Sequence, residues 1–130
     1  MNLIWTPTGG AAVTLGDDAV KSTIVVEGLA APYLVQKLLF FRGVKPTLTP
    51  RGGDEGSFVV TVQPNVANAD AASAYLKAEY ARRGQAGSLA WGRVTTTFTF
   101  TGAVLRSVSL VELNGARLRL RYSFGFADLT

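Results

Sequence analysis

Residues 104–126 read VLRSVSLVELNGARLRLRYSFGF, and they carry the clearest structural pattern in the sequence. Asn114-Gly115 tolerates the positive backbone angles of a type I′ turn, so the stretch predicts a hairpin centred on these two residues. In its second half every second residue is large and apolar, which is typical of a strand with one buried face. The predicted core face comprises Leu118, Leu120, Tyr122, Phe124 and Phe126.

A two-residue turn at Asn114-Gly115 also predicts the register of the hairpin. The expected inner pairs are Val111 with Leu118, Ser109 with Leu120, Ser107 with Tyr122 and Leu105 with Phe124. The expected outer pairs are Glu112 with Arg117, Leu110 with Arg119 and Val108 with Arg121. The outer face would then mix arginines with aliphatic residues. Either the arginine stems cover those residues, or another chain or a local loop does.

Further strands are predicted where short apolar runs alternate with turn residues. The predicted strands are Ala12–Leu15, Thr23–Glu27, Leu34–Phe41, Phe58–Val62, Val94–Phe100, Val104–Leu113 and Arg117–Phe126.

One helix is predicted at Ala69–Arg83, an alanine-rich segment without proline or β-branched residues. Asn68 or Asp70 would cap its start by accepting hydrogen bonds from free backbone N–H groups. Its narrow apolar stripe has a spacing of three to four residues and comprises Ala72, Tyr75, Leu76, Glu79 and Tyr80. Gly84 supplies a left-handed stop. The predicted fold is α+β but mainly β: an antiparallel β-barrel or sandwich with one flanking helix and a C-terminal hairpin.

Residues 42–57 read RGVKPTLTPRGGDEGS and predict a long exposed loop, because proline removes ladder donors and glycine favours turns. Loops of this length often carry binding. The candidate interface residues are those charged in this loop and those on the outer hairpin face: Arg42, Lys45, Arg51, Asp54, Glu55, Val108, Leu110, Arg117, Arg119 and Arg121.

The composition indicates one domain over residues 1–130 that acts without catalysis. The chain has 130 residues, of which 48% are hydrophobic, and this suffices for one core. It contains neither cysteine nor histidine, so it lacks thiolate nucleophiles and the usual metal ligand and general base. We therefore expect no enzyme activity, no metal and no cofactor.

The same sequence bounds the location and partners of the chain. The first ten residues lack the basic and apolar pattern of a signal peptide, so secretion by that route is not expected. The most apolar run, Tyr33–Phe41, is too short to span a bilayer, and no membrane partner is expected. The net charge of +4 is compatible with a polyanionic partner or with ordinary surface charge.

The layout resembles the tail-tube and baseplate-hub proteins of bacteriophages and related contractile injection machines. The resemblance lies in the loop Gly43–Gly56, the helix Ala69–Arg83 and the ending Phe98–Phe126. It implies a virion component, located in the phage tail or in the host cytoplasm during assembly. It also implies a homo-oligomeric ring in contact with other tail or baseplate proteins. DNA-passing channels in such particles tend to be acidic, so the arginine row favours an interface over a channel lining.

These observations lead to three hypotheses for the function of the chain. The leading hypothesis is a structural subunit that self-assembles, as in a phage tail tube, hub or baseplate. The alternative is a small β-barrel that binds nucleic acid, motivated by the charge and the arginine row. A small-ligand carrier is the third, although Phe98, Phe100, Tyr122 and Phe124 are expected to fill the interior.

Overall fold

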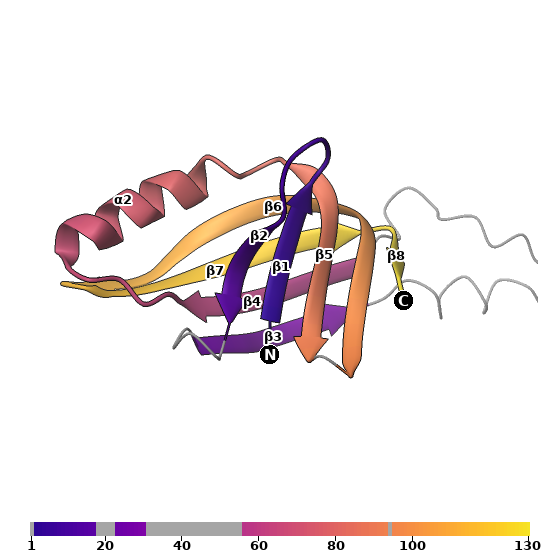
Figure 1. Cartoon of the computed structure of the whole chain (residues 1–130), viewed down its shortest axis with the longest axis horizontal. Helices are drawn as coiled ribbons and strands as arrows, with labels where there is room; N and C mark the ends of the chain where they lie inside the picture. Colours follow the sequence, from indigo (N-terminus) through magenta and orange to yellow (C-terminus); the bar gives the residue numbers. More distant parts are fainter. Residues whose placement is uncertain (1, 18–22, 31–55, 94) are drawn as a thin grey trace, which may run out of the picture.

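The computed structural model describes residues 2–17, 23–30, 56–93 and 95–130. Within these ranges the chain forms eight strands and one helix (Figure 1). The elements are β1 (Asn2–Pro7), β2 (Val13–Asp17), β3 (Thr23–Ala30), β4 (Gly56–Gln63), α2 (Ala69–Tyr80), β5 (Ala86–Arg93), β6 (Thr96–Asn114), β7 (Arg117–Phe126) and β8 (Asp128–Leu129).

The strands form one antiparallel sheet with the order β2-β1-β5-β6-β7-β4-β3, and β8 pairs with β6. The predicted class, mainly antiparallel β with a single helix, is confirmed. The described part of the sheet is not closed into a barrel, because β2 and β3 end it and no ladder joins them.

The long strand β6 divides the sheet into two layers. It pairs with β5 from Thr96 to Val104 and with β7 from Val104 to Asn114. In Figure 1, β1, β2 and β5 run across the direction of β3, β4 and β7, and β6 curves from one set into the other. A strand that changes layers in this way makes the corner of an orthogonal β-sandwich.

Aromatic side chains fill the space between the layers. Phe58 lies at the centre, with its ring centroid 4.9 Å from that of Phe100 and 6.4 Å from that of Phe124. The ring centroids of Trp5 and Phe124 lie 5.4 Å apart. The indole Nε1 of Trp5 donates a hydrogen bond of 3.0 Å to Oε1 of Gln85. All five predicted core residues of β7 are fully buried, so the predicted core face is confirmed.

Helix α2 lies over the β6–β7 hairpin (Figure 1). The Asn68 side chain caps its start by accepting from the backbone N–H of Ala71 at 2.8 Å, as one of the two predicted caps. The helix ends at Tyr80, three residues before the predicted end, and residues 81–84 form turns. Gly84 has a φ of +85°, as a left-handed stop requires.

The register predicted for the hairpin is wrong near its tip. The turn lies at Gly115-Ala116, where Gly115 has a φ of +60°, and Asn114 pairs with Arg117. Two bulges then shift the pairing by one residue each, so that the predicted pair Leu105 with Phe124 is recovered deeper in the sheet. Between the bulges, Val108 pairs with Tyr122 and Leu110 pairs with Leu120.

This shift moves both aliphatic residues away from the arginines. Because directly paired residues point to the same face of a sheet, Val108 and Leu110 share the side of Tyr122 and Leu120. Val108 is buried in the core, and the predicted mixed face of arginines and aliphatic residues does not form.

The remaining strand predictions agree with the structure in part. β2, β3, β4 and β7 overlap their predicted runs, and β6 joins two predicted strands into one. β1 and β5 were not predicted. Gly56 and Ser57, which end the predicted loop, begin β4 in the structure. The rest of that loop, residues 42–55, and the predicted strand Leu34–Phe41 lie outside the described residues.

In the described part of the chain, no helix is long and apolar enough to cross a membrane.

Candidate interaction surface

The outer face of β7 carries an arginine row that runs along the strand. Arg117, Arg119 and Arg121 alternate with the buried core residues and therefore point to the opposite side of the sheet. We call this surface the arginine face. It also includes the residues of β3, β4 and β6 that lie on this side of the sheet next to the three arginines.

Arg121 is held by a carboxylate from the edge strand. Its Nε lies 2.8 Å from Oε2 of Glu27 and its Nη2 lies 3.2 Å from Oε1, which is a two-point pairing of guanidinium with carboxylate. Glu27 occupies the bulge of β3. The Thr61 hydroxyl on β4 also donates to Glu27 Oε1, and Thr61 is buried although it lies on the outer side of the sheet.

These partners change the acidity of Glu27. The hydrogen bond from Thr61 contributes most, and the hydrogen bond from Arg121 adds to it, so the pKa of Glu27 lies below its ordinary value of 4.5. Arg119 acts in the same direction through its charge. The Glu27 carboxylate is therefore ionised at neutral pH and belongs to the arginine face as a fixed negative charge.

The other two arginines of the row differ in their partners. Arg117 Nε lies 2.9 Å from Oε1 of Glu112, so these two residues form an ion pair, although the ladder places Glu112 opposite Arg119 and not opposite Arg117 as predicted. Among the described residues, none forms a hydrogen bond or ion pair with Arg119, which is half-buried between its two arginine neighbours.

A fourth arginine reaches the same face from a bulge. Arg106 is the extra residue where the pairing of β6 shifts. A methyl group added to Gly125 would lie 2.6 Å from Arg106 Nε, so the guanidinium rests where Gly125 has no side chain. Gly125 alternates with the core residues of β7, and Arg106 therefore extends the arginine face beyond Arg121.

The end of the hairpin exposes three large apolar residues. Leu110, Val111 and Leu113 are 43%, 38% and 41% exposed, and we call them the hairpin tip cluster. Leu110 and Leu113 pair with Leu120 and Leu118, which are fully buried. The cluster thus continues the core to the surface of the molecule.

A buried polar cluster joins the helix to the sheet beneath this surface. Glu79 is only 4% exposed and accepts a hydrogen bond of 2.9 Å from the Tyr122 hydroxyl. Arg82 Nε lies 3.1 and 3.2 Å from its two oxygens. Burial raises the pKa of Tyr122 far above its ordinary value, and the Glu79 carboxylate raises it further. The predicted apolar stripe therefore contains a satisfied carboxylate.

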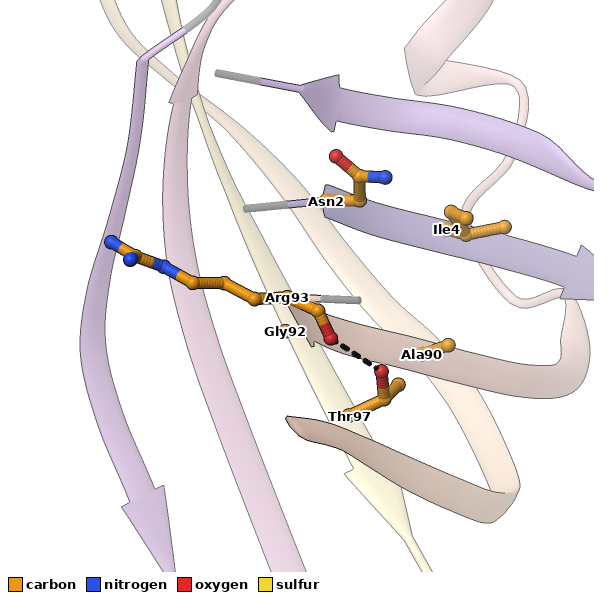
Figure 2. Close-up of a pocket in the computed structure, with 6 residues that line it drawn as sticks. All are labelled: Asn2, Ile4, Ala90, Gly92, Arg93 and Thr97. Atoms are coloured by element: carbon orange, nitrogen blue, oxygen red, sulfur yellow. Dashed lines mark hydrogen bonds between the residues drawn. The ribbon is translucent and has the colours of Figure 1, made fainter. Parts of the chain in front are cut away.

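The opposite layer carries a shallow depression with a volume of about 100 Å³ (Figure 2). The residues that line it are Asn2, Ile4, Ala90, Gly92, Arg93 and Thr97. The Thr97 hydroxyl donates to the Arg93 carbonyl at 2.9 Å, and in Figure 2 the Arg93 side chain runs away from Ile4 and Ala90. Of these six residues only Arg93 is charged, so the depression brings together no acid–base pair.

The structure brings together some of the predicted interface residues. Arg117, Arg119 and Arg121 form one row, Leu110 lies in the hairpin tip cluster, and Val108 lies in the core. Arg42, Lys45, Arg51, Asp54 and Glu55 lie outside the described residues. The described residues contain no group of three or more acidic side chains placed to hold a metal ion.

Sequence reasoning missed the groups that complete the arginine face. Glu27 is 94 residues from Arg121 along the chain, and Thr61 is 34 residues from Glu27. No local spacing relates such residues. Only the β3-β4-β7 order brings them together.

Comparisons of the chain with protein-family models, with curated proteins and with solved structures find no significant match.

Proposed function

We propose that this chain is a structural subunit that self-assembles through its surfaces, without enzymatic activity. The observation that carries the proposal is the hairpin tip cluster, in which three large apolar side chains are each more than a third exposed. Contiguous exposed apolar residues commonly mark contacts with another protein. Their position at the end of a hairpin lets them reach a neighbouring molecule.

The open sheet adds a second reason. β2 and β3 end the described sheet, and no other described strand pairs with their outer edges, which another chain can extend. A ring or tube in a phage tail or tail-like particle, as tube, hub or baseplate component, is the version of this proposal that we favour from the resemblance in sequence layout.

The test is the molar mass in solution. Light scattering after size exclusion, over a hundredfold range of concentration, should reveal oligomers of the native chain. Leu113→Ser should lower the oligomeric fraction, whereas Val25→Ser, a change of similar exposure on β3, should leave it unaltered. A strict monomer at every concentration, alone and mixed with the products of neighbouring genes, would overturn the proposal.

A nucleic-acid-binding module is the second candidate, and the exposed arginine row is the observation that favours it. Contacts with phosphates give an affinity that falls steeply with salt. Binding of labelled single-stranded DNA and RNA at low salt would test it, with a salt series to follow. The absence of binding at low salt removes this candidate.

A further inference from the structure

We infer that the arginine face is a docking site for an acidic, extended peptide segment of a partner protein. The inference rests on the position of Arg119 between Arg117 and Arg121. Arg117 and Arg121 each form an ion pair with a carboxylate, whereas Arg119 forms no ion pair among the described residues. The inference is independent of the proposed self-assembly, because it concerns the outer face of β7 and not the hairpin tip cluster.

The face has an excess of positive charge. The three arginines of the row, Arg117, Arg119 and Arg121, lie with two carboxylates, Glu27 and Glu112. Among the described residues, the charge of Arg119 is therefore left for an anionic partner. Arg119 is half-buried between two arginines that are held by ion pairs, so less of its side-chain freedom is lost on binding.

The ion pairs of the face indicate which anion fits it. Glu27 engages Arg121 through both oxygens, and Glu112 engages Arg117 at 2.9 Å. Both occupants are carboxylates, and the planar guanidinium fork matches a carboxylate at two points. A carboxylate from outside would complete the row at Arg119 in the same way.

The spacing of the row favours an extended partner. Alternate residues of a strand lie about 6.6 Å apart on one face. An extended peptide with acidic residues at alternate positions has the same repeat, so its carboxylates can meet successive arginines. Single-stranded nucleic acid fits less well, because its binding relies on base stacking. The outward residues described on β7 and on the paired part of β4 include no aromatic side chain.

The test is a binding titration of the intact chain with a fluorescent ten-residue peptide that has glutamate at alternate positions. The same peptide with glutamine is the uncharged control, and a single-stranded thymidine oligonucleotide is the competing polyanion. We expect the glutamate peptide to bind at low salt and the glutamine peptide not to bind.

Two charge-matched variants locate the site. Arg119→Gln should weaken peptide binding about tenfold, because one charge-assisted pair is lost. Arg93→Gln, which removes the same charge from the other layer, should change it less than twofold. Arg119→Lys keeps the charge without the planar fork and should weaken binding by an intermediate factor. This variant decides the matter if circular dichroism finds Arg119→Gln unfolded.

Three results would overturn the inference. The first is no binding of the glutamate peptide at low salt. The second is equal weakening by the changes at Arg119 and Arg93, which would mean that net charge alone attracts the peptide. The third is tighter binding of the oligonucleotide than of the peptide, which would assign the face to nucleic acid.

Discussion

The Tyr122 hydroxyl donates a hydrogen bond to the Glu79 carboxylate across 2.9 Å, and this bond joins the only helix of the described chain to the sheet. Arg82 approaches the same carboxylate from the turn that follows the helix. A buried carboxylate is tolerated only when it is paired and hydrogen-bonded. Glu79 meets both conditions here.

Tyr122→Phe should destabilise the fold by about 1.5–3 kcal/mol, because a hydrogen bond to a buried charged group is lost while the charge stays buried. Urea unfolding followed by circular dichroism measures the effect. Tyr80→Phe is the matched control, since it removes a hydroxyl that has no hydrogen-bond partner among the described residues. Equal stability of the Tyr122 variant and the native chain would contradict the importance of this bond.

Thr61→Val should raise the pKa of Glu27 toward its ordinary value of 4.5, because the hydrogen bond from Thr61 is the largest cause of the lowered pKa. The lowered pKa implies that Glu27 stabilises the folded state above about pH 4.5, and that this contribution is lost as the pH falls through the folded-state pKa. The side-chain carboxyl chemical shift in an NMR titration measures both midpoints. An unchanged midpoint in the variant would contradict the assigned cause.

Leu120→Asp should unfold the chain, because Leu120 is fully buried and an unpaired charge there is very costly. Leu110→Asp is the control at the directly paired position, where the side chain is 43% exposed. This second variant should keep the native circular dichroism spectrum. Two folded variants, or two unfolded ones, would show that the register described for the hairpin is incorrect.

Gly87→Ala should destabilise the contact between β5 and β1 by about 1–3 kcal/mol, the usual cost of overpacking. A Cβ atom at this position would lie 2.1 Å from the backbone oxygen of Thr6, which cannot move without separating the strands. Gly28→Ala is the control, since nothing lies within 4 Å of its added Cβ. Thermal unfolding should distinguish the two variants, and similar melting temperatures would contradict this account.

The sequence predicts those parts of the fold that depend on local chemistry. The helix cap at Asn68, the stop at Gly84 and the alternation of β7 each follow from residues close together in the chain. β5 was missed because its sequence, AGSLAWGR, contains two glycines and no β-branched residue. Pairing with β1 and β6 makes it a strand. β1 was missed as well, and it lies between β2 and β5.

The hairpin register was wrong for a related reason. The dipeptide Asn114-Gly115 suits the turn whether Asn114 is the first turn residue or the last strand residue, and the structure has the second arrangement. The two bulges that compensate for it depend on packing across the whole sheet. The candidate site shows the same limit, since the arginine row could be read from β7 alone but its partner Glu27 could not.

The position of β1 governs the order in which the sheet is completed during synthesis. β1 pairs with β2 directly after it in the chain, but its other neighbour is β5, more than eighty residues later. The edge of β1 that faces β5 therefore has no partner strand until residues 86–93 have been made. Pairings between such distant segments slow folding, and open strand edges invite aggregation in the interval. A chaperone that binds nascent chains would meet this protein with β1 paired to β2 and with both layers of the sheet still incomplete.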